Sequence, residues 1–200
     1  MNKLMTELRR TALVAGERVA LSGEYEQYTY LDLVAAVDSL AAELGQRGVR
    51  RAALIADNGP AWVIVDLACL QAGVAVIPIP TFFSAEQLEN TLASCGADTL
   101  ISDRRASDAQ IASVLAGSTA TSAFESQPQF RLWPLAVADQ AASLPLGTVK
   151  LTYTSGSTGA PKGVCLSADK LFATAAALNT ALLATPLQRH LAVLPLATLL

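Results

Sequence analysis

The chain has 200 residues, of which 52% are hydrophobic and 16% charged, and its formal net charge is −3. This length fits one domain, or one large domain and part of another, and the acidic balance gives no general basic field for nucleic acid. Three widely spaced cysteines and one histidine are too few for a zinc site and indicate reduced thiols in a cytoplasmic protein. The N-terminus lacks the apolar core of a signal peptide, and no apolar run is long enough for a transmembrane segment.

The first hundred residues alternate short β-branched runs with amphipathic stretches. Capping boxes at Thr29 and Ser84 open two helices, of which Gly45 and Gly48 end the first and Gly96 the second. The recurring strand–helix–strand steps predict parallel pairing with right-handed crossovers. Strands are expected at residues 18–22, 27–30, 51–57, 74–79 and 98–102, with a further helix at 58–73.

The second hundred residues are less regular, and a polar, loop-like stretch occupies residues 117–129. The whole pattern predicts the α/β class, with a layered, mostly parallel β-sheet and flanking helices. The chain stops on an apolar run without a polar tail, so we expect it to be truncated after Leu200. In this half, strands are expected at residues 148–153, 163–166 and 191–194, and helices at 107–115 and 168–184.

One segment carries the functional argument. Residues 151–163 read Leu-Thr-Tyr-Thr-Ser-Gly-Ser-Thr-Gly-Ala-Pro-Lys-Gly between two expected strands. The glycines let backbone N–H groups converge on an anion, the hydroxyl groups add donors, and Lys162 adds a flexible positive charge. No carboxylate occurs in residues 150–168 to compete with a phosphate. The segment therefore predicts a polyphosphate-binding loop. It matches neither a Walker A loop nor a dinucleotide-binding fingerprint, and a flexible Ser/Gly linker is the alternative.

This segment resembles the phosphate-loop signature of the adenylate-forming (AMP-binding) superfamily, which contains acyl- and aryl-CoA synthetases, peptide-synthetase adenylation domains and luciferases. Residues 28–33, 70–78 and 194–196 are similar to further motifs of that family. The resemblance implies that residues 1–200 are the N-terminal portion of a large AMP-binding domain. The C-terminal part of its own chain would then be a missing partner.

The resemblance also implies an activity, that of an acyl-CoA synthetase-like acid–thiol ligase. Such enzymes convert a small-molecule carboxylate and Mg-ATP into an acyl-adenylate and pyrophosphate, and a thiol such as coenzyme A then displaces AMP. The family's Mg²⁺-binding Glu, ribose-binding Asp and adenylation lysine have no counterpart here, so no catalytic or metal-binding residue is assigned. The 200-residue chain is accordingly expected to be inactive alone. The residues implied to hold the β- and γ-phosphates are Thr154, Ser155, Gly156, Ser157, Thr158, Gly159 and Lys162.

Several alternatives remain open at this point. The apolar composition favours a fatty acid, whereas acyl-AMP ligases, amino-acid adenylation domains and β-lactone synthetases use the same fold. A non-catalytic nucleotide-binding or scaffold module is a second hypothesis. A third is an unrelated NTPase with Asp57 as its Mg²⁺ ligand, although the Asn-Gly-Pro that follows suits a helix start better. Thr198 stands where many family members have His, and we interpret His190 and Trp62 as structural residues.

Overall fold

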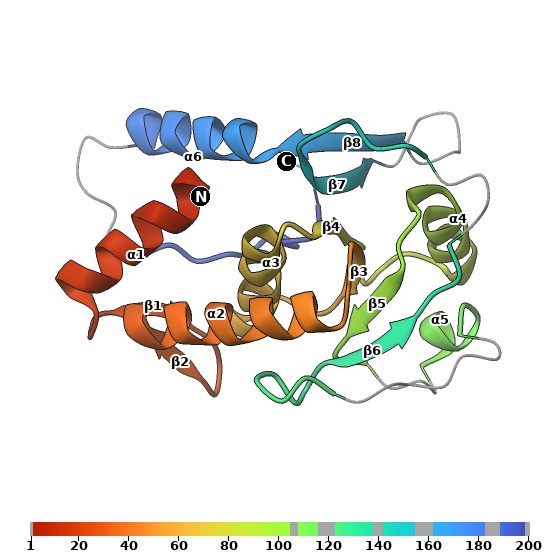
Figure 1. Ribbon diagram of the computed structural model, residues 1–200, viewed down its shortest axis with the longest axis horizontal. Coiled ribbons are helices and arrows are strands. Elements are labelled where there is room, and N and C mark those ends of the chain that lie inside the picture. The colour runs from red at the N-terminus through yellow and green to blue at the C-terminus, as the bar shows by residue number, and fades with distance from the viewer. Residues whose placement is uncertain are drawn as a thin grey trace.

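The structure is a computed structural model that describes residues 2–104, 108–115, 123–137, 142–154, 162–182 and 189–198 (Figure 1). The helices are α1 (Lys3–Ala15), α2 (Tyr30–Gln46), α3 (Pro60–Ala72), α4 (Ala85–Cys95), α5 (Ala109–Ala112) and α6 (Ala168–Leu182). The strands are β1 (Val19–Ser22), β2 (Gln27–Thr29), β3 (Arg51–Ile55), β4 (Ala75–Pro78), β5 (Thr99–Ser102), β6 (Arg131–Pro134), β7 (Thr148–Thr154) and β8 (Lys162–Ser167).

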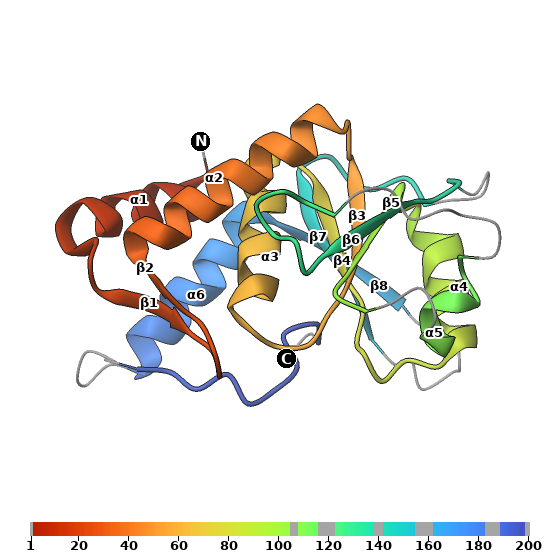
Figure 2. The same ribbon diagram turned by 90° about the horizontal axis from the view of Figure 1, so that it is seen from below.

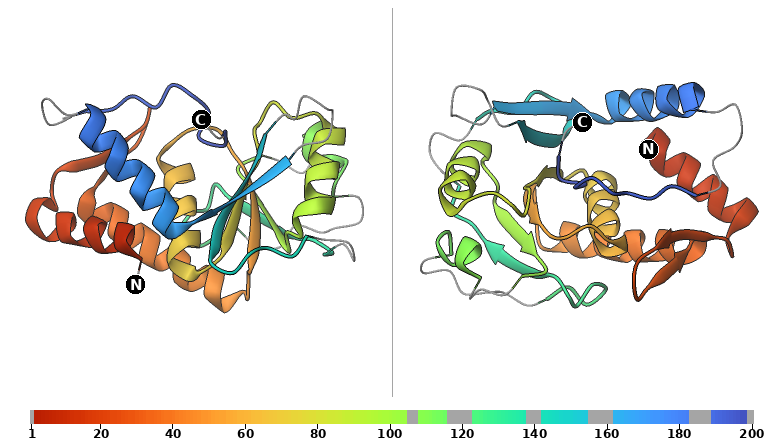
Figure 3. Two further views of the ribbon diagram at one scale, coloured as in Figure 1. Left: turned by 90° about the horizontal axis from the view of Figure 1, so that it is seen from above. Right: turned by 180° about the vertical axis from the view of Figure 1, so that it is seen from behind.

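A six-stranded sheet in the order β6-β5-β3-β4-β7-β8 forms the centre of the molecule. β3 pairs in parallel with β4 and β5, and β4 pairs in parallel with β7, whereas β6 and β8 are antiparallel edge strands. Helices α2 and α3 lie on one face of this sheet and α4 and α5 on the other (Figure 2, Figure 3). The predicted α/β class, with a layered, mostly parallel sheet and flanking helices, is therefore confirmed.

Successive side chains of the central strands enter two separate hydrophobic cores. In β3, Ala52 and Leu54 pack with α2 and α3, whereas Ala53 and Ile55 pack with α4 and α5. Both faces of the strand are buried, which is why the sequence shows a continuous apolar run rather than an alternating pattern. None of the described helices is both long enough and apolar enough to cross a bilayer.

The predicted helix starts are confirmed. The Thr29 hydroxyl accepts the Asp32 N–H at 3.2 Å, and the Asp32 carboxylate accepts the Thr29 N–H at 2.9 Å, which completes the capping box of α2. The equivalent box at Ser84 opens α4. The predicted end of α2 at Gly45 and Gly48 is also confirmed, because the helix ends at Gln46 and Gly48 is left-handed, with φ of 70°.

The second half of the chain differs from the prediction in three places. β6 was not expected, because it buries only Leu132 and Trp133 between exposed ends and so shows no alternating pattern. Helix α5 has four residues rather than the whole of 107–115. No strand forms at 191–194, where the side chains are exposed and a side chain from the β3–α3 turn holds the backbone. The expected helix at 168–184 is α6, which is described as far as Leu182.

Candidate functional site

Strands β7 and β8 form an antiparallel hairpin around the predicted phosphate-binding loop. Their register runs from Thr148↔Ser167 to Thr154↔Lys162, which is the last pair before the loop. The two strands expected on either side of the loop are therefore confirmed. Lys162 is exposed at the first position of β8, and it lies opposite the backbone of Thr154. The predicted phosphate ligands that lie outside the described residues are Ser155, Gly156, Ser157, Thr158 and Gly159.

The loop follows β7 at the edge where the parallel strands of the sheet end. β3, β4, β5 and β7 all run in the same direction, so their carboxyl ends share one edge. In open α/β sheets, ligands bind in the crevice outside this edge. Asp57 and Asn58 follow β3 there, and Asp103 follows β5. The sheet therefore brings the predicted loop to the edge that is typical of a ligand site.

The acidic residues at this edge are paired with each other and with an arginine. Arg104 forms ion pairs of 3.2 Å with Asp57 and Asp108, and the Asp57 N–H donates to Asp103 Oδ2 at 3.4 Å. Burial raises the pKa of Asp103, and the nearby charge of Asp57 raises it further. Asp57, the Mg²⁺ ligand of the NTPase hypothesis, is thus engaged with Arg104. The described part of the chain contains no group of three His, Cys, Asp or Glu side chains that could hold a metal ion.

The side chain of Asn58 holds the segment that carries Leu194-Pro195-Leu196 at the same edge. Its Nδ2 donates to the Leu194 carbonyl oxygen at 2.9 Å, and its Oδ1 accepts the Leu196 N–H at 2.9 Å. Helix α3 is capped instead by Gly59, without a side-chain hydrogen bond. Asn58 therefore links two segments far apart in sequence. From the sequence, Asn58 was interpreted as part of a helix start. The one further signal was its residue type, because an amide side chain after a buried strand can hydrogen-bond to backbone groups.

Two of the residues interpreted as structural are placed very differently. Trp62 is 4% exposed and lies in the core with α2 and α3, so its structural interpretation is confirmed. His190 is exposed and therefore takes no part in the core.

Thr198 donates its hydroxyl to the Pro195 carbonyl oxygen at 2.7 Å and so closes a turn near the end of the described chain. The three cysteines are free, with Cys69 and Cys95 buried and Cys165 half-buried.

Side chains on both faces of β7 attach this strand to neighbouring helices. On one face, Lys150 forms an ion pair with Asp66 of α3, with Nζ 2.8 Å from Oδ1. On the other face, the hydroxyl groups of Tyr153 and Ser94 in α4 are 2.9 Å apart. Sequence reasoning missed the ion pair, although a signal was present. Asp66 is the one charged residue of α3, and Lys150 is the one charged residue of β7. A charged side chain in a buried helix or strand needs a partner of opposite charge.

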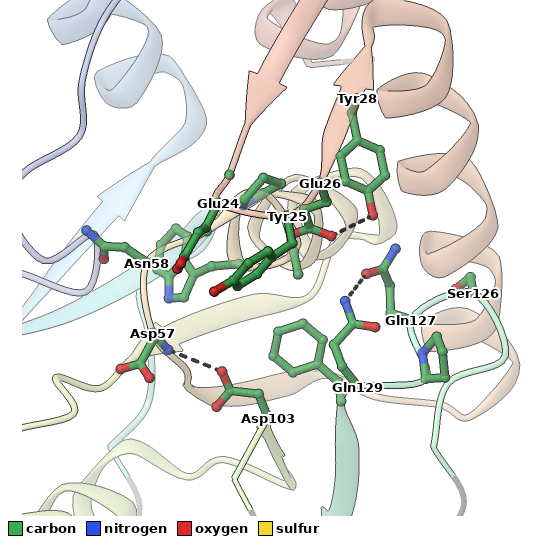
Figure 4. A pocket seen from close by; sticks show the side chains of 17 residues that line it. Glu24, Tyr25, Glu26, Tyr28, Asp57, Asn58, Asp103, Ser126, Gln127 and Gln129 are labelled. Carbon is green, nitrogen blue, oxygen red and sulfur yellow. Dashed lines mark hydrogen bonds between the residues drawn. The ribbon is translucent and has the colours of Figure 1, made fainter.

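A separate pocket of about 600 Å³ lies beside Asp57. Figure 4 shows Tyr25 and Glu26 of the β1–β2 turn on one side of it, and Asp103 and Gln129 on the other. No residue of β7 or β8, as far as these strands are described, lines this pocket. Its carboxylates, which also include Glu24, would repel a polyphosphate. The described lining of this pocket is therefore unsuited to a polyphosphate.

Comparisons with known proteins agree with this arrangement. The family model "AMP-binding enzyme" matches residues 8–199. Feruloyl-CoA synthase from an Amycolatopsis species is 34% identical over 149 residues, which cover 72% of this chain and 29% of that protein. Phosphinothricin tripeptide synthetase PhsC from Streptomyces viridochromogenes is 34% identical over 157 residues, 74% of this chain and 14% of that protein. The chain therefore spans less than a third of either relative.

A solved structure shares the fold. The o-succinylbenzoate CoA synthetase (MenE) from Bacillus subtilis, in complex with the acyl-adenylate intermediate OSB-AMP, superimposes with a TM-score of 0.69. The sequence identity is 23%, and the match covers 98% of this chain and 50% of that one. With a family model that matches nearly the whole chain and a shared fold, the chain belongs to the AMP-binding enzyme family.

Proposed function

We propose that this chain supplies the ATP phosphate-binding loop of an enzyme that activates a carboxylic acid. The observation that carries the proposal is the β7–β8 hairpin, which brings a Ser-, Thr- and Gly-rich loop to the carboxyl edge of a parallel sheet in a member of the AMP-binding family. A carboxylate oxygen attacks the α-phosphorus of ATP, and the bond to the β,γ-phosphates breaks. The products are an acyl-adenylate and pyrophosphate. A thiol, such as that of coenzyme A, then displaces AMP.

The loop acts on the leaving group in this proposal. Negative charge grows on the β,γ-phosphates as they depart, so N–H, hydroxyl and ammonium donors already in place stabilise the transition state. Lys162 supplies a flexible positive charge to the departing phosphates in this proposal and does not act as a base. Its pairing with Thr154 across the hairpin supports this role by holding both ends of the loop. The proposed phosphate ligands are Thr154, Ser155, Gly156, Ser157, Thr158, Gly159 and Lys162.

The proposed cofactors differ in how well the described residues fit them. The loop composition and the absence of carboxylates in residues 150–168 suit the triphosphate of ATP. Mg²⁺ would accompany ATP, but no three-ligand group occurs among the described residues, so we assign it neither ligands nor a step. Coenzyme A is proposed because a relative is a feruloyl-CoA synthase.

The substrate class and context are also proposals. The mean hydropathy of +0.39 supports a fatty acid, whereas the relatives include a feruloyl-CoA synthase and a tripeptide synthetase. We propose that residues 1–200 are the N-terminal portion of a larger AMP-binding domain, because the chain spans 29% of feruloyl-CoA synthase. Three free cysteines support a cytoplasmic location.

Carboxylate-dependent ATP–pyrophosphate exchange tests the proposal. The assay uses this chain and any longer product of the same gene, with a panel of fatty, aryl and amino acids. We expect exchange by the longer product with fatty acids, and none by the 200-residue chain. Lys162→Ala should lower exchange by about 10²-fold, as the loss of one transition-state donor does in other enzymes. Lys170→Ala, an exposed lysine in the first turn of α6, is the matched control and should stay within twofold.

Each part of the proposal is contradicted by a different result. Exchange by neither form, despite ATP binding, would favour a non-catalytic nucleotide-binding module. Exchange with aryl or amino acids alone would replace the fatty acid. Equal losses in Lys162→Ala and Lys170→Ala would remove the assigned role of the loop lysine.

A further inference from the structure

Strand β7 joins the loop hairpin to the rest of the sheet through β4. β7 pairs in parallel with β4 at Val76↔Lys150, and its other edge pairs with β8 from Thr148 to Thr154. A hairpin at the edge of a sheet depends on side-chain contacts to keep a fixed direction. The contacts of Lys150 therefore bear on where the loop points.

The side chain of Lys150 is enclosed by α3. Its Nζ lies 2.8 Å from Oδ1 and 2.9 Å from Oδ2 of Asp66, and 5.6 Å from the ring centre of Trp62, one helical turn earlier. The side chains of Lys150 and Asp66 are only 17% and 20% exposed. Among the ion pairs of the described residues, this one has the lowest exposure of its two side chains combined. Such a pair is strongly directional, because separating it leaves a charge in a poorly solvated place.

The other contacts of β7 near the loop are uncharged. Tyr153 shares a hydrogen bond with Ser94, and Gly163 of β8 packs so closely that an added Cβ would lie 2.9 Å from Leu151. Thr152, the next residue on the Lys150 face, is buried, and its hydroxyl has no hydrogen-bond partner in the described structure. The ion pair is thus the charged attachment of β7 to the helices on its faces.

Lys150 itself is too far back to bind the nucleotide. It precedes Thr154 by four residues, and a strand rises about 3.3 Å per residue, so about 13 Å separate the two backbones. Its ammonium group also faces α3 rather than the loop. Any effect of Lys150 on phosphate binding must therefore be transmitted by the strand.

We infer that the Asp66–Lys150 ion pair is the positioning element of the phosphate-binding loop. By fixing β7 against α3, the pair sets the direction of the hairpin and hence the place of Thr154 and Lys162 at the two ends of the loop. Neither Asp66 nor Lys150 touches the nucleotide. The consequence for phosphate affinity rests on the proposed function, whereas the consequence for the hairpin does not.

The test combines ligand affinity with local hydrogen exchange in the 200-residue chain. The variants are Asp66→Asn, Lys150→Met and the double variant, and Asp38→Asn, which breaks a more exposed pair with Arg9, is the control. Calorimetry measures the Kd of magnesium pyrophosphate and MgATP. Exchange is followed by mass spectrometry in peptides from β7, β8 and α2.

We expect each single variant to raise the Kd of pyrophosphate at least tenfold. The Kd of the double variant should be no higher than that of the single variant that binds more weakly. Residues that act as one unit give such non-additive effects. Amides of β7 and β8 should exchange at least tenfold faster, while those of α2 keep their protection. Asp38→Asn should change neither quantity by more than twofold. If a single variant does not fold, the double variant carries the test, since it leaves no buried charge unpaired.

Three results would overturn the inference: unchanged Kd values, weaker binding with unchanged exchange in β7 and β8, or faster exchange spread equally to α2. If the wild-type chain binds neither ligand, the proposed function fails. The exchange measurement then decides the inference alone, because a loss of protection confined to β7 and β8 supports the positioning role and unchanged protection refutes it.

Discussion

Glu43 provides the sharpest test of how the segment before β6 is held. Its carboxylate accepts the N–H groups of Glu125 and Ser126, each at 3.0 Å, and the Ser126 hydroxyl at 2.5 Å. The side chain is 15% exposed, with Arg47 at 4.0 Å. A carboxylate in the last turn of a helix opposes the helix dipole. The hydrogen bonds to residues 125 and 126 therefore explain why an acidic residue is tolerated at this position.

The magnitude follows from which donors lose their acceptor. In Glu43→Ala, the Glu125 N–H can turn to water because that hydrogen bond is exposed, whereas the two donors of Ser126 are partly buried. An unsatisfied buried donor costs about 1–3 kcal/mol. After a discount for partial exposure, we expect Glu43→Ala to lower the free energy of unfolding by about 2–3 kcal/mol. Glu43→Gln keeps one acceptor oxygen and should lose about 1 kcal/mol.

The pH dependence has a defined sign. Burial raises the pKa of Glu43, but the hydrogen bonds from Ser126 and Glu125 and the charge of Arg47 outweigh it, so the pKa lies below its ordinary value of 4.5. The contribution of Glu43 is therefore fully present above pH 4.5 and is lost as the pH falls through the lower folded-state pKa. Glu43→Gln should lack this part of the acid destabilisation.

Urea unfolding from pH 7 to pH 3 measures both effects, with an unchanged m-value as the sign that the denatured state is not altered. Glu89→Gln is the control, because Glu89 is an exposed carboxylate in α4, and its midpoint should not shift. Equal midpoints for wild type, Glu43→Gln and Glu43→Ala at pH 7 would refute the reasoning.

Three further predictions concern the backbone, a helix cap and the Asn58 side chain. Gly45 is helical with nothing within 4 Å of an added Cβ, so Gly45→Ala should raise the free energy of unfolding by about 0.5–1 kcal/mol. Gly73 has a φ of 71°, so Gly73→Ala should lower the free energy of unfolding by about 1 kcal/mol. Thermal unfolding compares the two variants, and equal shifts in their midpoints would contradict the argument. Thr29→Ala removes the capping box of α2 and should lower the urea midpoint by the equivalent of about 1 kcal/mol. Asn58→Ala removes both hydrogen bonds to Leu194 and Leu196 and should speed amide exchange at Leu196 at least tenfold, with no change in α2.

The first half of the fold was predictable because its signals are local. Both capping boxes involve side chains three residues apart, and the chain order of strand and helix fixes the parallel pairing through the handedness of the crossover. The buried run of β3 needs no knowledge of its partners to be recognised, because both of its faces are covered. β7 was predictable in the same way, because Leu151, Thr152 and Tyr153 are all buried.

The parts of the site that were missed depend on contacts between distant residues. Asp66 and Lys150 are 84 residues apart, and Asn58 and Leu194 are 136 residues apart. Periodicity within a window reports which face of an element is buried, but it does not report which element covers that face. A charge in a buried helix shows that a partner exists, and only the fold identifies the partner as Lys150.

The failed strand at residues 191–194 shows how one polar side chain overrides a hydrophobic pattern. An apolar run becomes a strand when its backbone groups find an open sheet edge. Here two hydrogen bonds with Asn58, one donated and one accepted by its side chain, fix the backbone at Leu194 and Leu196 beside the carboxyl edge of β3, while Leu191 and Val193 stay 81% and 75% exposed. The Asn58 side chain donates one hydrogen bond and accepts one, as the edge of a β-strand would. The backbone carbonyl of Leu194 and the N–H of Leu196 are therefore hydrogen-bonded without pairing to a strand. The apolar pattern therefore marks a surface next to the proposed nucleotide site rather than a seventh strand.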